Sequence, residues 1–310
     1  MIESSSPVEA PQSAIRQCSP AHLFRSFWIG GFESATHRNT RGERLDMIAG
    51  AQHDVRVRED YRLLRAVGIA TARDALRWHL IDNGGRYDFS SFEPMLKAAI
   101  ETGVQVIWDL CHYGYPDDID LLKPEFVDRF ARFSAAVTRF IRDHTDEIPY
   151  FSPVNEINFF AWAAARDLMY PHAFGRDNEI KTQLVRAGIA SVQAIRDVEP
   201  RARITWPEPT IHVLPPRNRP DFAPAARAYR ESQFDAWDMI AGRLHPELGG
   251  KPEYLDIVGS NFYHSNEWEY EGSGRLRWED EPRDERWVPY HELLREIRQR
   301  YERPLYVAET

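Results

Sequence analysis

Short β-prone runs alternate with longer segments of helical periodicity from residue 27 to residue 310. The β-prone runs cover residues 27–32, 69–76, 104–110, 148–155, 203–206, 256–262 and 305–308. Most of them precede a segment in which apolar residues recur three or four positions apart, which is the spacing of one helix face. Strands that alternate with helices in this way predict a parallel sheet that is buried on both faces.

The helices can be placed from their apolar stripes and their stop signals. One stripe over residues 57–67 stops at Gly68, and a second over residues 92–100 stops at Gly103. Glycine commonly ends a helix because it adopts the left-handed backbone without a steric penalty. A long third stripe covers residues 126–141, and further helical segments are predicted over 180–198, 223–244 and 289–301.

This order of elements predicts one barrel domain. No Gly-x-Gly-x-x-Gly or Walker sequence follows a predicted strand, which weakens the nucleotide-binding doubly wound alternative. No linker divides the chain after residue 26, so we predict an α/β fold, the (β/α)8 TIM barrel, over residues 27–310. Residues 1–26 are rich in Ser, Pro, Ala and Gln, and we predict a disordered N-terminal arm there.

Composition and charge argue against a disordered chain, a nucleic-acid partner and a membrane span. The 310 residues are 43% hydrophobic and 28% charged, which suits a chain with a large core rather than a disordered one. Lysine and arginine number 39 against 48 acidic residues, so a nucleic-acid partner is not expected. No run approaches the roughly 18 apolar residues of a membrane span. With no secretory signal and only two cysteines, we predict a soluble cytoplasmic protein without a disulfide framework or a four-ligand zinc site.

The ends of the predicted strands carry the candidate chemistry, because barrel enzymes place their sites at the carboxyl ends of strands. Acids, amides, imidazoles and aromatic rings recur there, a combination that suits sugars. Acids can break the glycosidic bond, amides and imidazoles can hold hydroxyls, and aromatic faces can stack on the ring. The residues at these ends include Glu33, His37, Arg73, Asp109, His112, Asn155, Glu156, Trp206, Glu208, Asn261, Tyr263 and Glu309.

Two glutamates stand out among these residues. Glu156 lies between the apolar residues Val154 and Ile157, and Glu309 follows an apolar run over residues 305–308. A charge in such a setting is costly unless it has a partner or a chemical role. A lone glutamate at a strand end is nevertheless more often a solvated loop charge, and His112 is as well explained as a core histidine. A thiol or metal hydrolase built on Asp109, Cys111 and His112 is a further alternative, although one short cluster is a weak signal.

The strand-end motifs, taken in order, resemble those of the clan A glycoside hydrolases, and most closely the family 1 β-glucosidases. The fourth strand ends in Asn155-Glu156, similar to the Asn-Glu-Pro of that family but without its proline. The seventh ends Val-Ala-Glu309-Thr, similar to Ile-Thr-Glu-Asn. The sixth contains Gly-Ser-Asn-Phe-Tyr263, similar to Gly-x-Asn-Tyr-Tyr. His37 stands where the family has a sugar-binding glutamine.

The resemblance implies a retaining hydrolase of β-glycosides that works by double displacement, with Glu156 as acid and base and Glu309 as nucleophile. It implies that Arg73 and Tyr263 contact Glu309, and that no metal or organic cofactor is needed. The alternative is a catalytically weak or inactive barrel that binds carbohydrate or a partner. The substrate-binding residues expected from strand position and resemblance are His37, Arg73, His112, Asn155, Tyr263, Trp206 and Glu208.

The sequence supplies seven strands for an eight-stranded fold, because the seventh ends at residue 308 of 310. We therefore expect a barrel that is truncated after strand 7 and open beside the first strand. A truncated chain, a partner segment that closes the barrel and an open variant are the three explanations of this feature. We also expect the isolated chain to be poorly stable or inactive.

Overall fold

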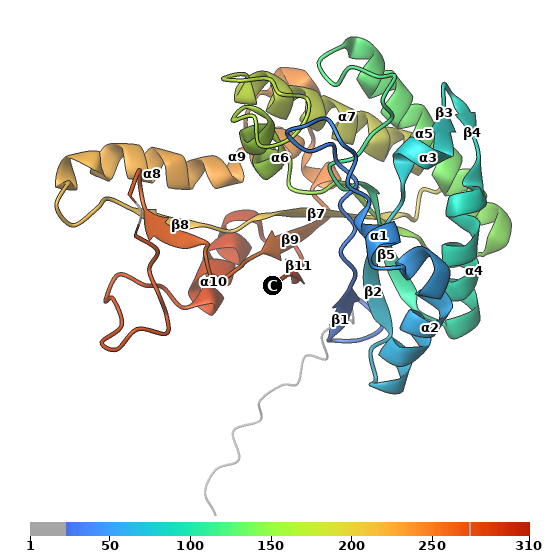
Figure 1. The fold of residues 1–310 in the computed structure, drawn as a ribbon, viewed down its shortest axis with the longest axis horizontal. Helices are drawn as coiled ribbons and strands as arrows, with labels where there is room; N and C mark the ends of the chain where they lie inside the picture. The colour runs from blue at the N-terminus through green and yellow to red at the C-terminus, as the bar shows by residue number, and fades with distance from the viewer. Residues whose placement is uncertain (1–22, 273) are drawn as a thin grey trace, which may run out of the picture.

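A computed structural model describes residues 23–272 and 274–310, and it shows a seven-stranded parallel sheet that curls into a nearly closed barrel (Figure 1). The strand order is β1-β2-β5-β6-β7-β9-β11. These seven strands are the seven that the sequence predicts, so the β/α barrel class is confirmed. Their bounds are β1 (Ile29–Gly31), β2 (Thr71–Ala75), β5 (Gln105–Cys111), β6 (Tyr150–Val154), β7 (Arg203–Pro209), β9 (Ile257–Asn261) and β11 (Leu305–Glu309).

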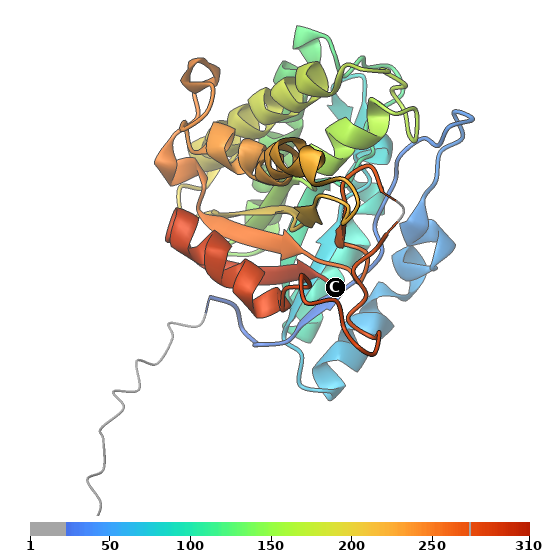
Figure 2. The ribbon, with the colours of Figure 1, turned by 90° about the vertical axis from the view of Figure 1, so that its left-hand side faces the viewer.

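The helices lie around the outside of this sheet (Figures 1 and 2). The helix ends predicted at Gly68 and Gly103 are confirmed. Both glycines have a left-handed backbone, with a φ of 85° at Gly68 after α2 and of 68° at Gly103 after α4. No helix in residues 23–272 and 274–310 is long and apolar enough to cross a membrane. The helices are α1 (Met47–Gly50), α2 (His53–Ala66), α3 (Trp78–Ile81), α4 (Glu93–Thr102), α5 (Pro124–His144), α6 (Ile157–Ala164), α7 (Asp177–Val198), α8 (Ala223–Glu231), α9 (Asp235–Ile240) and α10 (Tyr290–Tyr301).

The predicted single helix over 223–244 is wrong, because a 3-10 turn at Ser232–Phe234 separates α8 from α9. The side chain of Gln233 turns inward there and is only 4% exposed. Its oxygen accepts from the backbone N–H of Ile211, and its amide donates to the backbone carbonyl of Arg230. A buried polar side chain that bonds the backbone of a neighbouring loop does not fit the apolar face of a continuous helix.

Two short pairs of strands stand outside the barrel. β3 (Asp82–Asn83) and β4 (Arg86–Tyr87) form an antiparallel pair, and β8 (His212–Leu214) lies parallel to β10 (Glu267–Glu269). The sequence predicted neither pair, because strands of two or three residues carry no readable periodicity.

Aromatic residues of α5 form much of the packing between the sheet and its helices. Phe126, Phe130 and Phe133 are fully or almost fully buried, as the long apolar stripe of this segment predicts. The ring of Phe133 stacks on Trp78 with 5.2 Å between the ring centroids. Burying each such side chain contributes about 1.5–3 kcal/mol, so this face stabilises the packing of α5 on α3.

The first described residues close the amino-terminal end of the barrel. Phe24 is 8% exposed, and its ring lies 5.6 Å from that of Tyr150 and 5.2 Å from that of Tyr306. The hydroxyl of Tyr150 donates to the carbonyl of Leu23 at 3.0 Å. The predicted arm over residues 1–26 is therefore wrong at its end, because residues 23–26 pack on the barrel; residues 1–22 lie outside the described part.

The barrel is open between β1 and β11, which lie near each other in both views (Figures 1 and 2). Strand β1 pairs with β2, and β11 pairs with β9; within residues 23–272 and 274–310 no pairing joins β1 to β11. This confirms the expected open side. The β9–β11 register shifts between Val307 and Glu309, and such irregularities re-aim side chains next to sites.

Candidate active site

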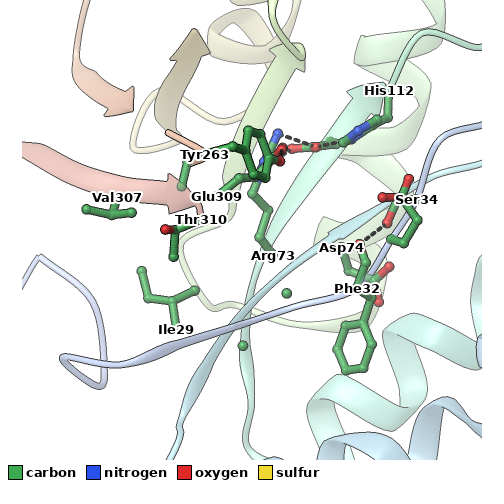
Figure 3. A pocket seen from close by; sticks show the side chains of 15 residues that line it. Ile29, Phe32, Ser34, Arg73, Asp74, His112, Tyr263, Val307, Glu309 and Thr310 are labelled. Atoms are coloured by element: carbon green, nitrogen blue, oxygen red, sulfur yellow. Dashed lines mark hydrogen bonds and ion pairs between the residues drawn. The ribbon is translucent and has the colours of Figure 1, made fainter. Parts of the chain in front are cut away.

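A cavity of 410 Å³ lies at the carboxyl ends of the strands and along the open side of the barrel (Figure 3). Backbone and side chains of β1 and β11 form two of its walls, with Ile29 and Val307 on opposite strands. Several charged and polar side chains point into it from different strands, as the strand-end reasoning predicts. They include Glu33, Arg73, Asp109, His112, Tyr263 and Glu309.

Glu309 ends β11 and lies among groups that favour its ionised form. One carboxylate oxygen forms an ion pair with the guanidinium of Arg73, and the other accepts from the hydroxyl of Tyr263. Burial raises the pKa of Glu309, but the charges of Arg73 and His112 and the hydrogen bond from Tyr263 outweigh it. The pKa of Glu309 therefore lies below its ordinary value, and the group is a carboxylate at neutral pH.

Arg73 of β2 connects Glu309 with the rest of the site. It is 5% exposed, and its Nη2 atom lies 2.7 Å from Oδ2 of Asp109. The same nitrogen donates to Oδ1 of Asn155 at 2.5 Å. Asp109 in turn lies 2.9 Å from Nδ1 of His112, which lines the cavity. The guanidinium thus fixes three strand ends relative to one another through charge-assisted hydrogen bonds.

Glu156 has a different environment, built from neutral donors. It is 6% exposed, and its Oε2 accepts from the Tyr113 hydroxyl at 2.5 Å while its Oε1 accepts from Nδ2 of Asn261 at 2.8 Å. Burial and the charge of Glu309 raise the pKa of Glu156 to about 7. The two hydrogen bonds lower this pKa, but by less than burial and the Glu309 charge raise it. Glu156 does not line the 410 Å³ cavity. It is next in the chain to Asn155, which accepts a hydrogen bond from Arg73.

The sequence motifs predict no role for Tyr113 or Asn261, although both residues lie next to or near predicted site residues. Tyr113 has a φ of 65°, a left-handed conformation that is uncommon for a tyrosine and that belongs to the turn ending β5. Its hydroxyl accepts from Asn155 Nδ2 at 2.9 Å while it donates to Glu156. Only the fold shows that these neutral side chains converge on the carboxyl of Glu156, because they come from separate strand ends.

Four predicted substrate-binding residues do not line the cavity. Trp206 is 1% exposed and its indole donates to the carbonyl of Tyr254 at 2.8 Å. Its ring faces α7, where a Cβ built on Gly188 would lie 2.9 Å from it. The predicted substrate contact of Trp206 is therefore wrong, because the side chain points outward into the core between the sheet and α7.

Asn155, Glu208 and His37 are the other three. Asn155 is fully buried, and its side chain accepts from Arg73 and donates to the Tyr113 hydroxyl. Glu208 is 1% exposed, and both its oxygens accept from backbone N–H groups of α6, so its predicted contact with substrate is also wrong. His37 is outside the cavity lining, with its ring 6.2 Å from that of Tyr113. Burial, followed by the charge of His112, lowers the pKa of His37, so it is neutral at pH 7.

The thiol or metal alternative finds no support in the geometry. Cys111 is 1% exposed, and burial raises the pKa of its thiol to about 12, which opposes formation of a thiolate nucleophile. In the part of the chain that the structure describes, no group of three or more His, Cys, Asp or Glu side chains is placed to hold a metal ion.

Comparison with solved structures decides the fold family. A β-glucosidase from Thermotoga maritima in complex with glucoimidazole superposes with a TM-score of 0.67 at 15% identity, over 92% of this chain and 77% of that one. The fold is therefore similar to that of a β-glucosidase, and a family 1 β-glucosidase from the same organism also matches, with a TM-score of 0.60. The AHE enzyme from Alicyclobacillus herbarius gives a TM-score of 0.69 at 19% identity, over 92% of this chain and 79% of that one.

A third structure, a β-glycosidase, gives a TM-score of 0.61 at 18% identity. The match covers 82% of this chain and 66% of that one, so the chain spans just under two thirds of the length of that β-glycosidase. No protein-family model and no curated protein sequence matches the chain. The likeness to β-glucosidases is therefore one of fold, and the chemistry has to be argued from the residues of this chain.

Proposed function

We propose that this chain is a retaining β-glycoside hydrolase in which Glu309 is the nucleophile and Glu156 the general acid and base. The observation that carries the proposal is the contrast between the contacts of the two carboxyls: Glu309 is paired with the guanidinium of Arg73, whereas Glu156 is buried against the neutral donors Tyr113 and Asn261. Burial and the Glu309 charge raise the pKa of Glu156 to about 7, whereas Arg73 keeps the pKa of Glu309 low. Two carboxyls with pKa values pushed apart in this way are suited to act as acid and base.

In the first step a carboxylate oxygen of Glu309 attacks the anomeric carbon as the bond to the leaving oxygen breaks. Glu156 gives its proton to that oxygen, and its raised pKa keeps this proton in place up to about pH 7. Arg73 and Tyr263 hold the attacking carboxylate through both of its oxygens. His112, which lines the cavity, is the side chain that we assign to a sugar hydroxyl.

The second step uses the same pair with reversed roles. Ester formation on Glu309 removes the negative charge that raises the pKa of Glu156, so that pKa falls and Glu156 becomes a base. Glu156 then takes a proton from water, which attacks the anomeric carbon and releases the sugar with its original configuration. Asn155 supports both steps by holding Arg73 at 2.5 Å rather than by a free hydrogen-bonding group of its own.

The open side of the barrel favours a second candidate, a barrel that binds carbohydrate with little or no turnover. The cavity extends between β1 and β11, and Tyr263 and Val307 beside Glu309 are 41% and 37% exposed. Water that reaches the nucleophile weakens the electrostatic interactions on which catalysis depends.

A nitrophenyl glycoside screen with NMR detection of the first anomer released tests the proposal. We expect turnover of at least one β-glycoside with release of the β-anomer. Release of the α-anomer would exclude double displacement. Sugar binding without turnover would instead support the second candidate.

A further inference from the structure

Two consecutive residues of β7 hold three consecutive backbone amides at the start of α6. The N–H of Glu156 donates to the carbonyl of Pro207 at 3.0 Å. The next two amides, those of Ile157 and Asn158, donate to Oε1 and Oε2 of Glu208 at 2.7 and 3.0 Å. The segment that carries the proposed acid is thus bound to a neighbouring strand through its backbone.

This segment needs such a support for two reasons. Glu156 has φ 48° and ψ 61°, a left-handed conformation that is unfavourable for a residue with a Cβ. Glu156 is also the residue before the first turn of α6, where a side chain commonly accepts from the free N–H groups of the helix. Its own side chain makes no such hydrogen bond, because its carboxyl is turned to Tyr113 and Asn261.

Glu208 is an unusual residue to find buried, because it forms no ion pair within residues 23–272 and 274–310. The nearby cation Lys181 is bound to Asp235 at 2.8 Å. Burial raises the pKa of Glu208 to about 8, and the two amides are the main groups that oppose this rise. A buried carboxyl is costly, and both hydrogen bonds that the Glu208 side chain makes within the described residues go to the segment that carries Glu156.

We propose that Glu208 is a positioning residue for Glu156: its carboxyl binds the amides of Ile157 and Asn158 and so holds the left-handed turn that aims Glu156 at Tyr113, Asn261 and the leaving oxygen. This inference rests on the proposed function for its catalytic part. It assigns Glu208 no contact with substrate, since both its oxygens are occupied by the backbone.

Glu208→Gln tests the inference, because it keeps the size of the side chain but turns an N–H₂ group toward one of the two amides. Glu267→Gln is the matched control. Glu267 is also a buried glutamate, 2% exposed, that accepts from a single backbone N–H, that of Val288, and it lies outside the site. Both variants are compared with the unaltered chain for kcat/KM on phenyl and on 2,4-dinitrophenyl glycosides.

A comparison of two leaving groups distinguishes misplacement of Glu156 from a general loss of structure. Phenyl glycosides need a proton from Glu156, so we expect Glu208→Gln to lower their kcat/KM by about 10–100-fold. Dinitrophenolate leaves without a proton, so its kcat/KM is expected to stay within about 3-fold. Glu267→Gln is expected to change neither value. Equal losses on both substrates, or no loss on phenyl glycosides, would overturn the inference.

Amide hydrogen exchange provides a second readout that needs no turnover. We expect the Ile157 and Asn158 amides to exchange at least about 10-fold faster in Glu208→Gln, with the rest of the barrel unchanged. Unchanged exchange at these two amides would contradict the positioning role. A chain that turns over no glycoside would refute the proposed function, while the exchange rates would still decide whether Glu208 holds this turn.

Discussion

The two proposed catalytic glutamates occupy contrasting regions of one site. Glu309 lies at the open side of the barrel, with 23% of its side chain exposed, against the fixed positive charge of Arg73. Glu156 lies in the closed wall, 6% exposed, among the neutral donors Tyr113 and Asn261. The same residue type is therefore kept ionised in one region and has a raised pKa in the other, because charge compensation is supplied to only one of them.

The largest expected effect comes from removing the charge on the open side. Glu309→Gln removes the attacking oxygen, and we expect kcat on nitrophenyl glycosides to fall by about 10⁴–10⁶-fold. It also removes the negative charge that raises the pKa of Glu156, so that pKa should fall. Stopped assays measure the residual kcat of Glu309→Gln. The pKa of Glu156 in this variant is measured by ¹³C NMR of the glutamate-labelled protein. A Glu156 pKa that stays near 7 would show that the two regions are not coupled.

Removing the proton donor on the closed side has a smaller and more selective effect. Glu156→Gln should lower kcat/KM for phenyl glycosides by about 10²–10⁴-fold and spare dinitrophenyl glycosides. The kcat for dinitrophenyl glycosides should nevertheless fall, because hydrolysis of the glycosyl-enzyme loses its general base. Azide should restore this kcat, because it attacks the glycosyl-enzyme without a general base. Equal loss on both substrates would assign Glu156 a role other than that of proton donor.

Tyr113→Phe removes a hydrogen bond of Glu156 without replacing either glutamate. The Tyr113 hydrogen bond lowers the pKa of Glu156, so its loss should raise that pKa further above about 7. The alkaline limb of kcat/KM, where the acid loses its proton, should move upward by about 0.5–1 pH unit. The acidic limb, which reports Glu309, should stay in place. A downward shift of the alkaline limb would contradict the hydrogen-bond assignment.

The smallest expected effect on catalysis comes from a substitution at Gly188, where α7 packs on the outer face of the barrel. In Gly188→Ala the new methyl group would lie 2.9 Å from the Trp206 ring, so we expect about 1–3 kcal/mol of destabilisation in urea unfolding. The kcat per folded molecule should not change, because Trp206 packs on α7 instead of reaching the cavity. A changed KM would restore Trp206 as a substrate contact.

The sequence was sufficient for the strands and for the order of the strand ends, because alternating β-prone and helical segments dictate a parallel barrel. Strand position predicted that Arg73, Tyr263 and Glu309 share one rim, and the family resemblance implied the contacts of Arg73 and Tyr263 with Glu309 that the structure shows. The sequence was wrong for Trp206 and Glu208 because strand position alone does not say whether a side chain points into the barrel or toward a helix. That direction depends on barrel curvature and on bulges, which one sequence does not reveal.

Covalent trapping identifies the residue that attacks the sugar. The chain is incubated with a 2,4-dinitrophenyl 2-deoxy-2-fluoro-β-glycoside of the sugar that the screen selects, and intact mass is measured. The account predicts a mass gain of one fluoroglycosyl group per chain, located at Glu309 by peptide mapping and absent from Glu309→Gln. No gain with a sugar that is turned over, or a label at another residue, would contradict Glu309 as the nucleophile.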